Sequence, residues 1–152
     1  MPGISRFDEA FPMTRILVLC TGNSTRSQMA HGYLQFFAGS RAEVLSAGVE
    51  THGLNPRAVA VMAEDGIDIT HHTSNHVDEY RHLTIDYVIT VCDSAAQRCP
   101  LWVGRTHRTH QPFDDPSRQP ATEEGDVLVN YRHVRDQIRL FCQGFVVRQF
   151  IL

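Results

Sequence analysis

The stretch RILVLCTGNSTRS, residues 15–27, decides the fold class of this 152-residue chain. Residues 15–20 form a continuous apolar run, which is typical of a strand buried on both faces of a parallel sheet. Gly22 and Asn23 interrupt the run, and apolar side chains then recur at helical spacing over residues 27–37. A buried strand, a short polar loop and a helix in succession indicate an α/β fold.

The rest of the chain repeats this alternation. We expect further strands at 43–47, 85–91 and near 106–110. We expect one helix to start at Pro56 and three others to span 76–82, 93–97 and 123–149. These elements predict a four-stranded parallel sheet flanked by helices, in the flavodoxin-like strand order. Ligands bind such sheets at the carboxyl ends of strands, so Cys20 and Cys92, which each follow a strand, should face one crevice.

Length and composition predict one domain over residues 15–152, preceded by an N-terminal extension over residues 1–14. The hydrophobic share of 42% and the charged share of 20% are those of a globular domain. A net charge of -3 argues against a general nucleic-acid partner. The apolar run at 16–20 is too short for a membrane helix or a secretion signal, so we expect a cytoplasmic protein without a membrane partner. In a reducing compartment its cysteines should be thiols rather than permanent disulfides.

The loop after the first strand has the chemistry of an oxyanion site. Its backbone N–H groups form an anion-binding nest, and the following helix N-terminus adds positive potential. Arg26 offers two parallel donors to a tetrahedral oxyanion, and together these groups should lower the pKa of Cys20 and make it a nucleophilic thiolate. Ser27 is placed to donate to that thiolate, and Asn23 to brace the loop through its own backbone. The predicted oxyanion-binding residues are Thr21, Gly22, Asn23, Ser24, Thr25, Arg26 and Ser27.

The pattern Cys-x5-Arg-Ser at 20–27 resembles the phosphate loop of the low-molecular-weight protein tyrosine phosphatases. The longer string Cys-Thr-Gly-Asn-Ser-x-Arg-Ser-Gln-Met-Ala at 20–30 resembles the thioredoxin-coupled arsenate reductases built on the same fold. The segments 46–56, 72–74 and 91–100 resemble the reductases too, so the resemblance runs from about residue 15 to 141. It implies a low-molecular-weight phosphatase-like fold and an arsenate or phosphate oxyanion as ligand.

The resemblance also implies a relay of three thiols. Cys20 forms an adduct with arsenate, Cys92 attacks Cys20 and releases arsenite, and Cys99 attacks Cys92. The resulting Cys92–Cys99 disulfide is then reduced by a thioredoxin-like reductase, with no tightly bound cofactor. A helix over residues 92–99 would separate its ends by about 10 Å, whereas a disulfide needs Cα atoms about 4.4–6.8 Å apart. The segment must therefore unwind when it is oxidised.

Phe113-Asp-Asp-Pro116 resembles the acid loop of the same family, and we assign Asp115 as the general acid. An ordinary turn is the alternative interpretation of this segment. Ser117 and Arg118 stand where a phosphatase typically has an aromatic residue, which favours a small inorganic oxyanion. His31 and Asn75 fall where some arsenate reductases have carboxylates near a potassium ion, and this puts a potassium site in doubt.

Two rival functions remain open. A low-molecular-weight phosphatase that hydrolyses phosphate monoesters would need only Cys20, Arg26 and Asp115, and an oxyanion-binding module would need no reactive thiol. We expect no metal, because the spacing of Cys92, Cys99, His107 and His110 does not match a zinc knuckle. We interpret His107 and His110 as a solvated basic edge, and Cys142 and Trp102 as packing residues.

Overall fold

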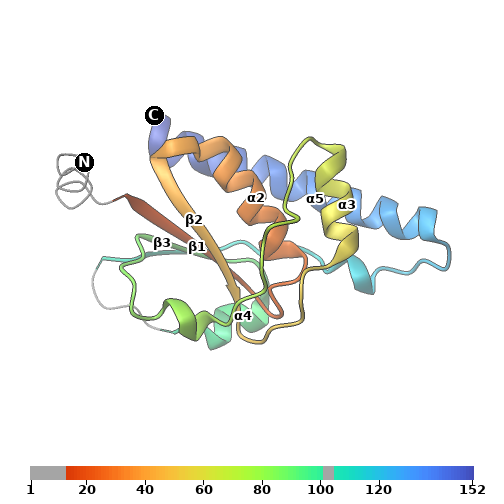
Figure 1. Cartoon of the computed structure of the whole chain (residues 1–152), viewed down its shortest axis with the longest axis horizontal. Helices are drawn as coiled ribbons and strands as arrows, with labels where there is room; N and C mark the ends of the chain where they lie inside the picture. Colours follow the sequence, from red (N-terminus) through yellow and green to blue (C-terminus); the bar gives the residue numbers. More distant parts are fainter. Residues whose placement is uncertain (1–12, 101–104) are drawn as a thin grey trace.

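The computed structural model describes residues 13–100 and 105–152. Its parallel sheet has four strands in the order β2-β1-β3-β4 (Figure 1). Their bounds are β1 (Thr14–Cys20), β2 (Ala42–Gly48), β3 (Tyr87–Thr90) and β4 (His107–His110). The predicted sheet and its flavodoxin-like order are confirmed. Of the predicted extension at 1–14, only Met13 and Thr14 are described, and Thr14 already belongs to β1.

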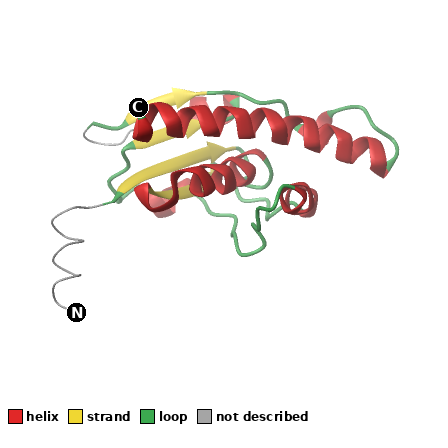
Figure 2. Ribbon diagram, turned by 90° about the horizontal axis from the view of Figure 1, so that it is seen from above, coloured by secondary structure: helices red, strands yellow, loops and turns green. Residues whose placement is uncertain are grey.

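Helices cover both faces of this sheet. Figure 1 shows α2, α3 and α5 above the sheet and α4 below it, and Figure 2 shows α5 running along the sheet. The bounds are α2 (Arg26–Ala38), α3 (Pro56–Glu64), α4 (Asp93–Arg98) and α5 (Glu124–Val146). The helix predicted at 76–82 is a 3-10 turn, Val77–Tyr80, and the end of the long predicted helix is a π-helical turn, Val147–Ile151. Among the described residues, no helix has the length and apolar character needed to cross a membrane.

The core lies between the sheet and the α2–α5 layer. Residues 16–19 of β1 have no exposed surface, as the continuous apolar run predicts for a central strand. Tyr131, Ile138 and Cys142 of α5 are fully buried as well, so Cys142 is the core thiol that the sequence predicts. Burying one large apolar side chain contributes about 1.5–3 kcal/mol, so this layer fixes the sheet on which the site is built.

The carboxyl ends of the strands bring the functional loops together. Cys20 ends β1, and Cys92 follows the neighbouring strand β3 by two residues. Gly48 ends β2 beside them, and a Cβ atom on it would lie 2.2 Å from the Glu50 carbonyl oxygen and 2.7 Å from that of Thr21. The backbone of this strand end therefore approaches the loop as closely as only glycine allows.

Candidate active site

The loop between β1 and α2 is held by contacts from other segments. Asn23 has a φ of 48°, a left-handed conformation that asparagine tolerates better than most residues. Its side-chain Nδ2 donates to Ser27 Oγ at 2.8 Å, and its Oδ1 accepts from the backbone N–H of Asn75 at 2.9 Å. Asn23 therefore braces the loop through Ser27 and Asn75 rather than through its own backbone. Ser27, in the described structure, bonds to Asn23 and not to the Cys20 sulfur as predicted.

The carbonyl groups of the loop are turned outward. The Gly22 carbonyl accepts from Ser74 Oγ and from the His52 N–H, and the Asn23 carbonyl accepts from Gln28 Nε2 at 3.0 Å. The Ser24 carbonyl accepts from the Asn55 N–H at 3.1 Å. Because a peptide's N–H group points opposite to its carbonyl, this bracing leaves the loop amides to face the cleft as an anion nest.

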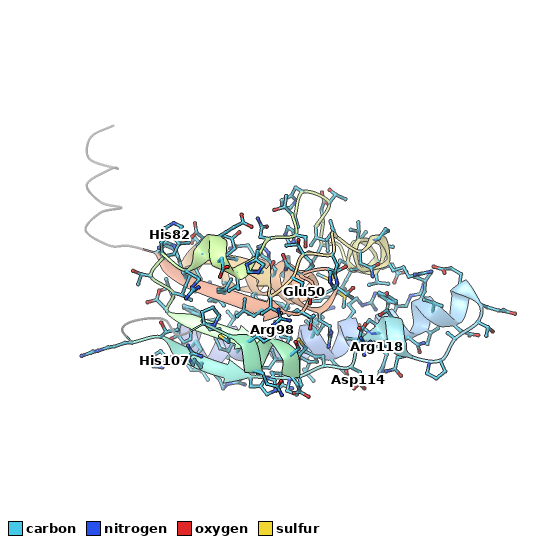
Figure 3. The ribbon with its side chains drawn as sticks, turned by 90° about the horizontal axis from the view of Figure 1, so that it is seen from below. Glu50, His82, Arg98, His107, Asp114 and Arg118 are labelled. Carbon is cyan, nitrogen blue, oxygen red and sulfur yellow. The ribbon has the colours of Figure 1, made fainter. Side chains whose placement is uncertain are left out.

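The cleft above the loop has a volume of about 560 Å³. Arg26 enters it with its side chain only 14% exposed, donates to the Phe113 carbonyl at 3.1 Å and lies 3.8 Å from Asp115 Oδ2. Arg118, which is labelled in Figure 3, lies 3.7 Å from the same Asp115 oxygen. The other oxygen, Oδ1, accepts from the backbone and hydroxyl of Ser117. Asp115 is thus fixed at the cleft, where its carboxyl group faces the space above the loop.

A second cysteine, Cys92, lies beside the oxyanion loop. Cys20 is the last residue of β1. Cys92 is the N-cap residue of α4, and its sulfur lies 3.1 Å from the Thr21 hydroxyl. The neighbouring Cys20 thiol, together with the Thr21 hydroxyl, the Ala95 N–H and Arg26, lowers the pKa of Cys92 to about 5. The neighbouring Cys92 thiol, together with burial, raises the pKa of Cys20. The predicted lowering of the Cys20 pKa is therefore wrong for this ligand-free state, because Cys92 and burial outweigh Arg26 and the Thr21 N–H.

Cys99 lies apart from this pair. It caps the C-terminus of α4, so the full helix separates it from Cys92. Its half-buried sulfur faces a second cavity, of about 210 Å³, beside β3 and β4. All four cysteines are free thiols in this state. The structure therefore places Cys92 beside the oxyanion loop, but of the two cysteines predicted to face one crevice only Cys20 lines the cleft, and Cys99 can reach Cys92 only after α4 unwinds.

Comparison with known proteins assigns the fold and the loop to one family. The sequence profile described as low molecular weight phosphotyrosine protein phosphatase matches residues 15–149. The chain belongs to this family. An arsenate reductase of Bacillus subtilis is 46% identical over 123 residues, which cover 81% of this chain and 88% of the relative. An arsenate reductase of Staphylococcus epidermidis is 40% identical over 133 residues, covering 88% and 96%. A solved structure described as an arsenate reductase in the phosphate binding state matches with a TM-score of 0.76 at 29% identity, covering 90% of this chain and 98% of that one.

Two residues that contact the oxyanion loop, Asn55 and His52, are not among the predicted site residues. Asn55 donates from Nδ2 to Thr25 Oγ1 and to the Tyr131 hydroxyl, both at 3.0 Å. An asparagine directly before a helix-starting proline is a helix N-cap signal, and this signal was available in the sequence. His52 covers Gly22, where an added Cβ would lie 2.3 Å from the His52 Nδ1 atom. No local pattern indicates that contact, because it arises only when the β2–α3 loop folds over the oxyanion loop.

The histidines considered for ion binding are engaged elsewhere. His31 Nδ1 lies 2.9 Å from Ser46 Oγ, and its ring stacks on that of His72 with centroids 4.1 Å apart. His110, exposed on β4, bonds to Thr90 and to Asp93. Within residues 13–100 and 105–152, no three His, Cys, Asp or Glu side chains converge on a metal position. Trp102 lies outside the described residues.

Proposed function

We propose that this protein reduces arsenate to arsenite, with Cys20 as the nucleophile and Cys92 as the thiol that resolves the adduct. The observation that carries the proposal is a second thiol beside the oxyanion loop: the Cys92 sulfur lies 3.1 Å from the hydroxyl of Thr21, the residue that follows Cys20. A phosphatase requires a single nucleophile, whereas a reductase requires a second thiol that can supply two electrons by forming a disulfide. The relatives named arsenate reductase support the same reaction.

Adduct formation begins with arsenate in the nest, held by the loop amides and the Arg26 guanidinium. The proton on Cys20 passes to the neighbouring Cys92, and the Cys20 thiolate attacks arsenic. A sulfur–arsenic bond forms and an arsenic–oxygen bond breaks. The departing hydroxyl takes a proton from Asp115 and leaves as water. The positive Arg26 and the loop N–H groups stabilise the charge on the remaining oxygens.

Reduction follows when Cys92 has lost its proton to solvent. The Cys92 thiolate attacks the Cys20 sulfur, the sulfur–arsenic bond breaks, and its electron pair stays on arsenic, which leaves as arsenite. A Cys20–Cys92 disulfide forms in this step. Cys99 then attacks Cys92 and frees the Cys20 thiolate as α4 unwinds. An external dithiol of the thioredoxin class reduces the Cys92–Cys99 disulfide, which places the protein in the reducing cytoplasm.

The test is arsenate-dependent NADPH oxidation in the presence of thioredoxin and thioredoxin reductase. Wild type is compared with Cys92→Ser and Cys99→Ser, and Cys142→Ala serves as the matched control because this thiol lies in the core. We expect wild type and Cys142→Ala to turn over continuously, whereas the two serine variants stop after a single adduct or disulfide. Continuous turnover by Cys92→Ser would overturn the proposal.

Phosphate-ester hydrolysis is the second candidate function. Cys20, Arg26 and Asp115 lie together in the cleft, and the family profile is that of phosphatases. If the arsenate assay shows no turnover while wild type and both serine variants hydrolyse an aryl phosphate equally, the protein is a phosphatase. Phosphate binding with neither reaction would identify an oxyanion-binding module.

A further inference from the structure

Arg108 reaches from β4 to the far end of α4. Its Nη1 lies 3.6 Å from Cys99 Sγ, and its Nη2 donates to the Pro100 carbonyl at 2.7 Å. One guanidinium therefore holds both the sulfur and the backbone of the residue after it. The planar fork of arginine fits such a pair of contacts, whereas the point charge of lysine does not.

Among the described residues, the surroundings of Cys99 disfavour its thiolate apart from the contact with Arg108. The cavity beside the sulfur is lined by the uncharged Val88 and Thr90 of β3, Ala96 of α4 and Thr109 of β4. His110 also lines it, but its ring nitrogens are taken by Thr90 and Asp93. Burial raises the pKa of Cys99, and the charge and hydrogen bond of Arg108 oppose that rise.

We propose that Arg108 is the positioning residue for Cys99: it stores the thiol at the sheet edge and stabilises the thiolate that attacks Cys92. The inference rests on the proposed function, since it assumes that Cys99 takes over the disulfide. In that exchange the Cys99–Cys92 bond forms, the Cys20–Cys92 bond breaks and Cys20 leaves as a thiolate, so no further oxidant is needed. Only the thiolate performs this attack at a useful rate, and Arg108 sets how much of it is present.

Arg98 offers a matched control for this residue. It precedes Cys99 and fastens the same helix end from another side, because its Nη2 donates to the Val49 carbonyl at 3.3 Å and its Nη1 lies 3.5 Å from Glu50 (Figure 3). Loss of either arginine frees the C-terminus of α4 from one carbonyl contact. Of the two substitutions, only the loss of Arg108 removes a positive charge from beside the Cys99 sulfur.

The test is the pH dependence of Cys99 alkylation by iodoacetamide in the reduced full-length protein, read for each cysteine by peptide mass mapping. Arg108→Gln should raise the pH midpoint of Cys99 alkylation by about one unit, which lowers the thiolate fraction at neutral pH about tenfold. Arg98→Gln should change the plateau rate but not the midpoint. An equal midpoint in wild type and Arg108→Gln would overturn the proposal.

A second pair of variants guards against loss of folding. If circular dichroism shows that Arg108→Gln is unfolded, Arg108→Lys is compared with Arg98→Lys. The lysine at 108 should give a smaller rise in the midpoint and the lysine at 98 none, and two unchanged midpoints would equally overturn the proposal.

Failure of the relay itself is distinguishable, because alkylation needs no arsenate. With arsenate and no reductant, Arg108→Gln should accumulate the Cys20–Cys92 disulfide that wild type passes on to Cys99. Absence of any disulfide in wild type would defeat the proposed function while leaving the alkylation result readable.

Discussion

The Thr21 hydroxyl lies 3.1 Å from the Cys92 sulfur and so joins the oxyanion loop to the start of α4. This bond helps to lower the pKa of Cys92, after the larger effect of the neighbouring Cys20 thiol. Thr21→Val keeps the shape of the side chain and removes the hydroxyl. We expect the pKa of Cys92 to rise by about one unit, as follows from losing one hydrogen bond to a charged group.

The measurement is a pH titration of thiolate absorbance in the ultraviolet, with Cys92→Ser as the baseline that identifies the Cys92 signal. Thr21→Ser retains a hydroxyl and should titrate like wild type. A titration of Thr21→Val that matches wild type would mean that the Thr21 contact does not stabilise the thiolate.

Gly48 sets the position of the loop by its lack of a side chain. An added Cβ would lie 2.2 Å, 2.7 Å and 2.8 Å from backbone atoms of Glu50, Thr21 and Asn23, so the loop itself must move. Gly48→Ala should abolish phosphate binding measured by calorimetry and lower the free energy of unfolding by about 1–3 kcal/mol. Gly125→Ala is the control, because its added methyl group meets nothing within 4 Å. Normal phosphate affinity in Gly48→Ala would contradict this account.

Local patterns in the sequence were sufficient for the sheet, the loop and the general position of the thiols. The apolar run at 16–19 is buried because a central strand has both faces covered, and that is visible in the run itself. The partners of Asn23 were not predictable in this way. One of them is the backbone of Asn75, which is 52 residues away in the sequence and reaches the loop only in the folded chain.

The pKa of Cys20 was not predictable from local sequence for a similar reason. Arg26 and the Thr21 N–H do lower the pKa of Cys20, as the loop sequence indicates. The neighbouring Cys92 thiol and burial outweigh them, and both depend on tertiary packing that brings α4 onto the loop. The site thus holds two neighbouring thiols that shift each other's pKa, where the sequence alone indicates one activated cysteine.

The stacked histidines behind the loop predict a pH-dependent stability. Burial, followed by the charges of neighbouring histidines, lowers the pKa of His31 to about 3, and burial likewise lowers the pKa of His72 to about 4. Both pKa values are below the pKa of about 6.5 that a histidine has in the unfolded chain. Between the folded and the unfolded pKa, the unfolded chain therefore binds more protons than the folded protein. The stability that these neutral rings confer is fully present above about pH 6.5 and is lost progressively as the pH falls toward the folded values.

Urea unfolding of wild type and His31→Asn at about pH 7 and about pH 5 measures this effect. The difference in unfolding free energy between the two pH values should be smaller in His31→Asn, which has lost one of the two groups. His82→Asn is the control: it removes an exposed histidine that takes no part in the stack of His31, His71 and His72. The same pH slope in His31→Asn as in wild type would show that His31 protonates equally in both states.

Asn55 links the oxyanion loop to two helices, and its loss should affect substrate binding as well as stability. Its Oδ1 caps α3 by accepting from the Arg57 N–H at 2.8 Å, while its Nδ2 donates to Thr25 and Tyr131. Asn55→Ala should lower the free energy of unfolding by about 2–3 kcal/mol, from one cap and two hydrogen bonds, and weaken phosphate binding because Thr25 loses its brace.

Tyr131→Phe separates these two consequences. It removes only the link to α5, since the Tyr131 hydroxyl accepts from Asn55 while the Thr25 bond stays in place. We expect a loss of about 1 kcal/mol in urea unfolding and unchanged phosphate affinity by calorimetry. If Tyr131→Phe weakens phosphate binding as much as Asn55→Ala does, the position of α5 rather than the Thr25 contact controls the loop.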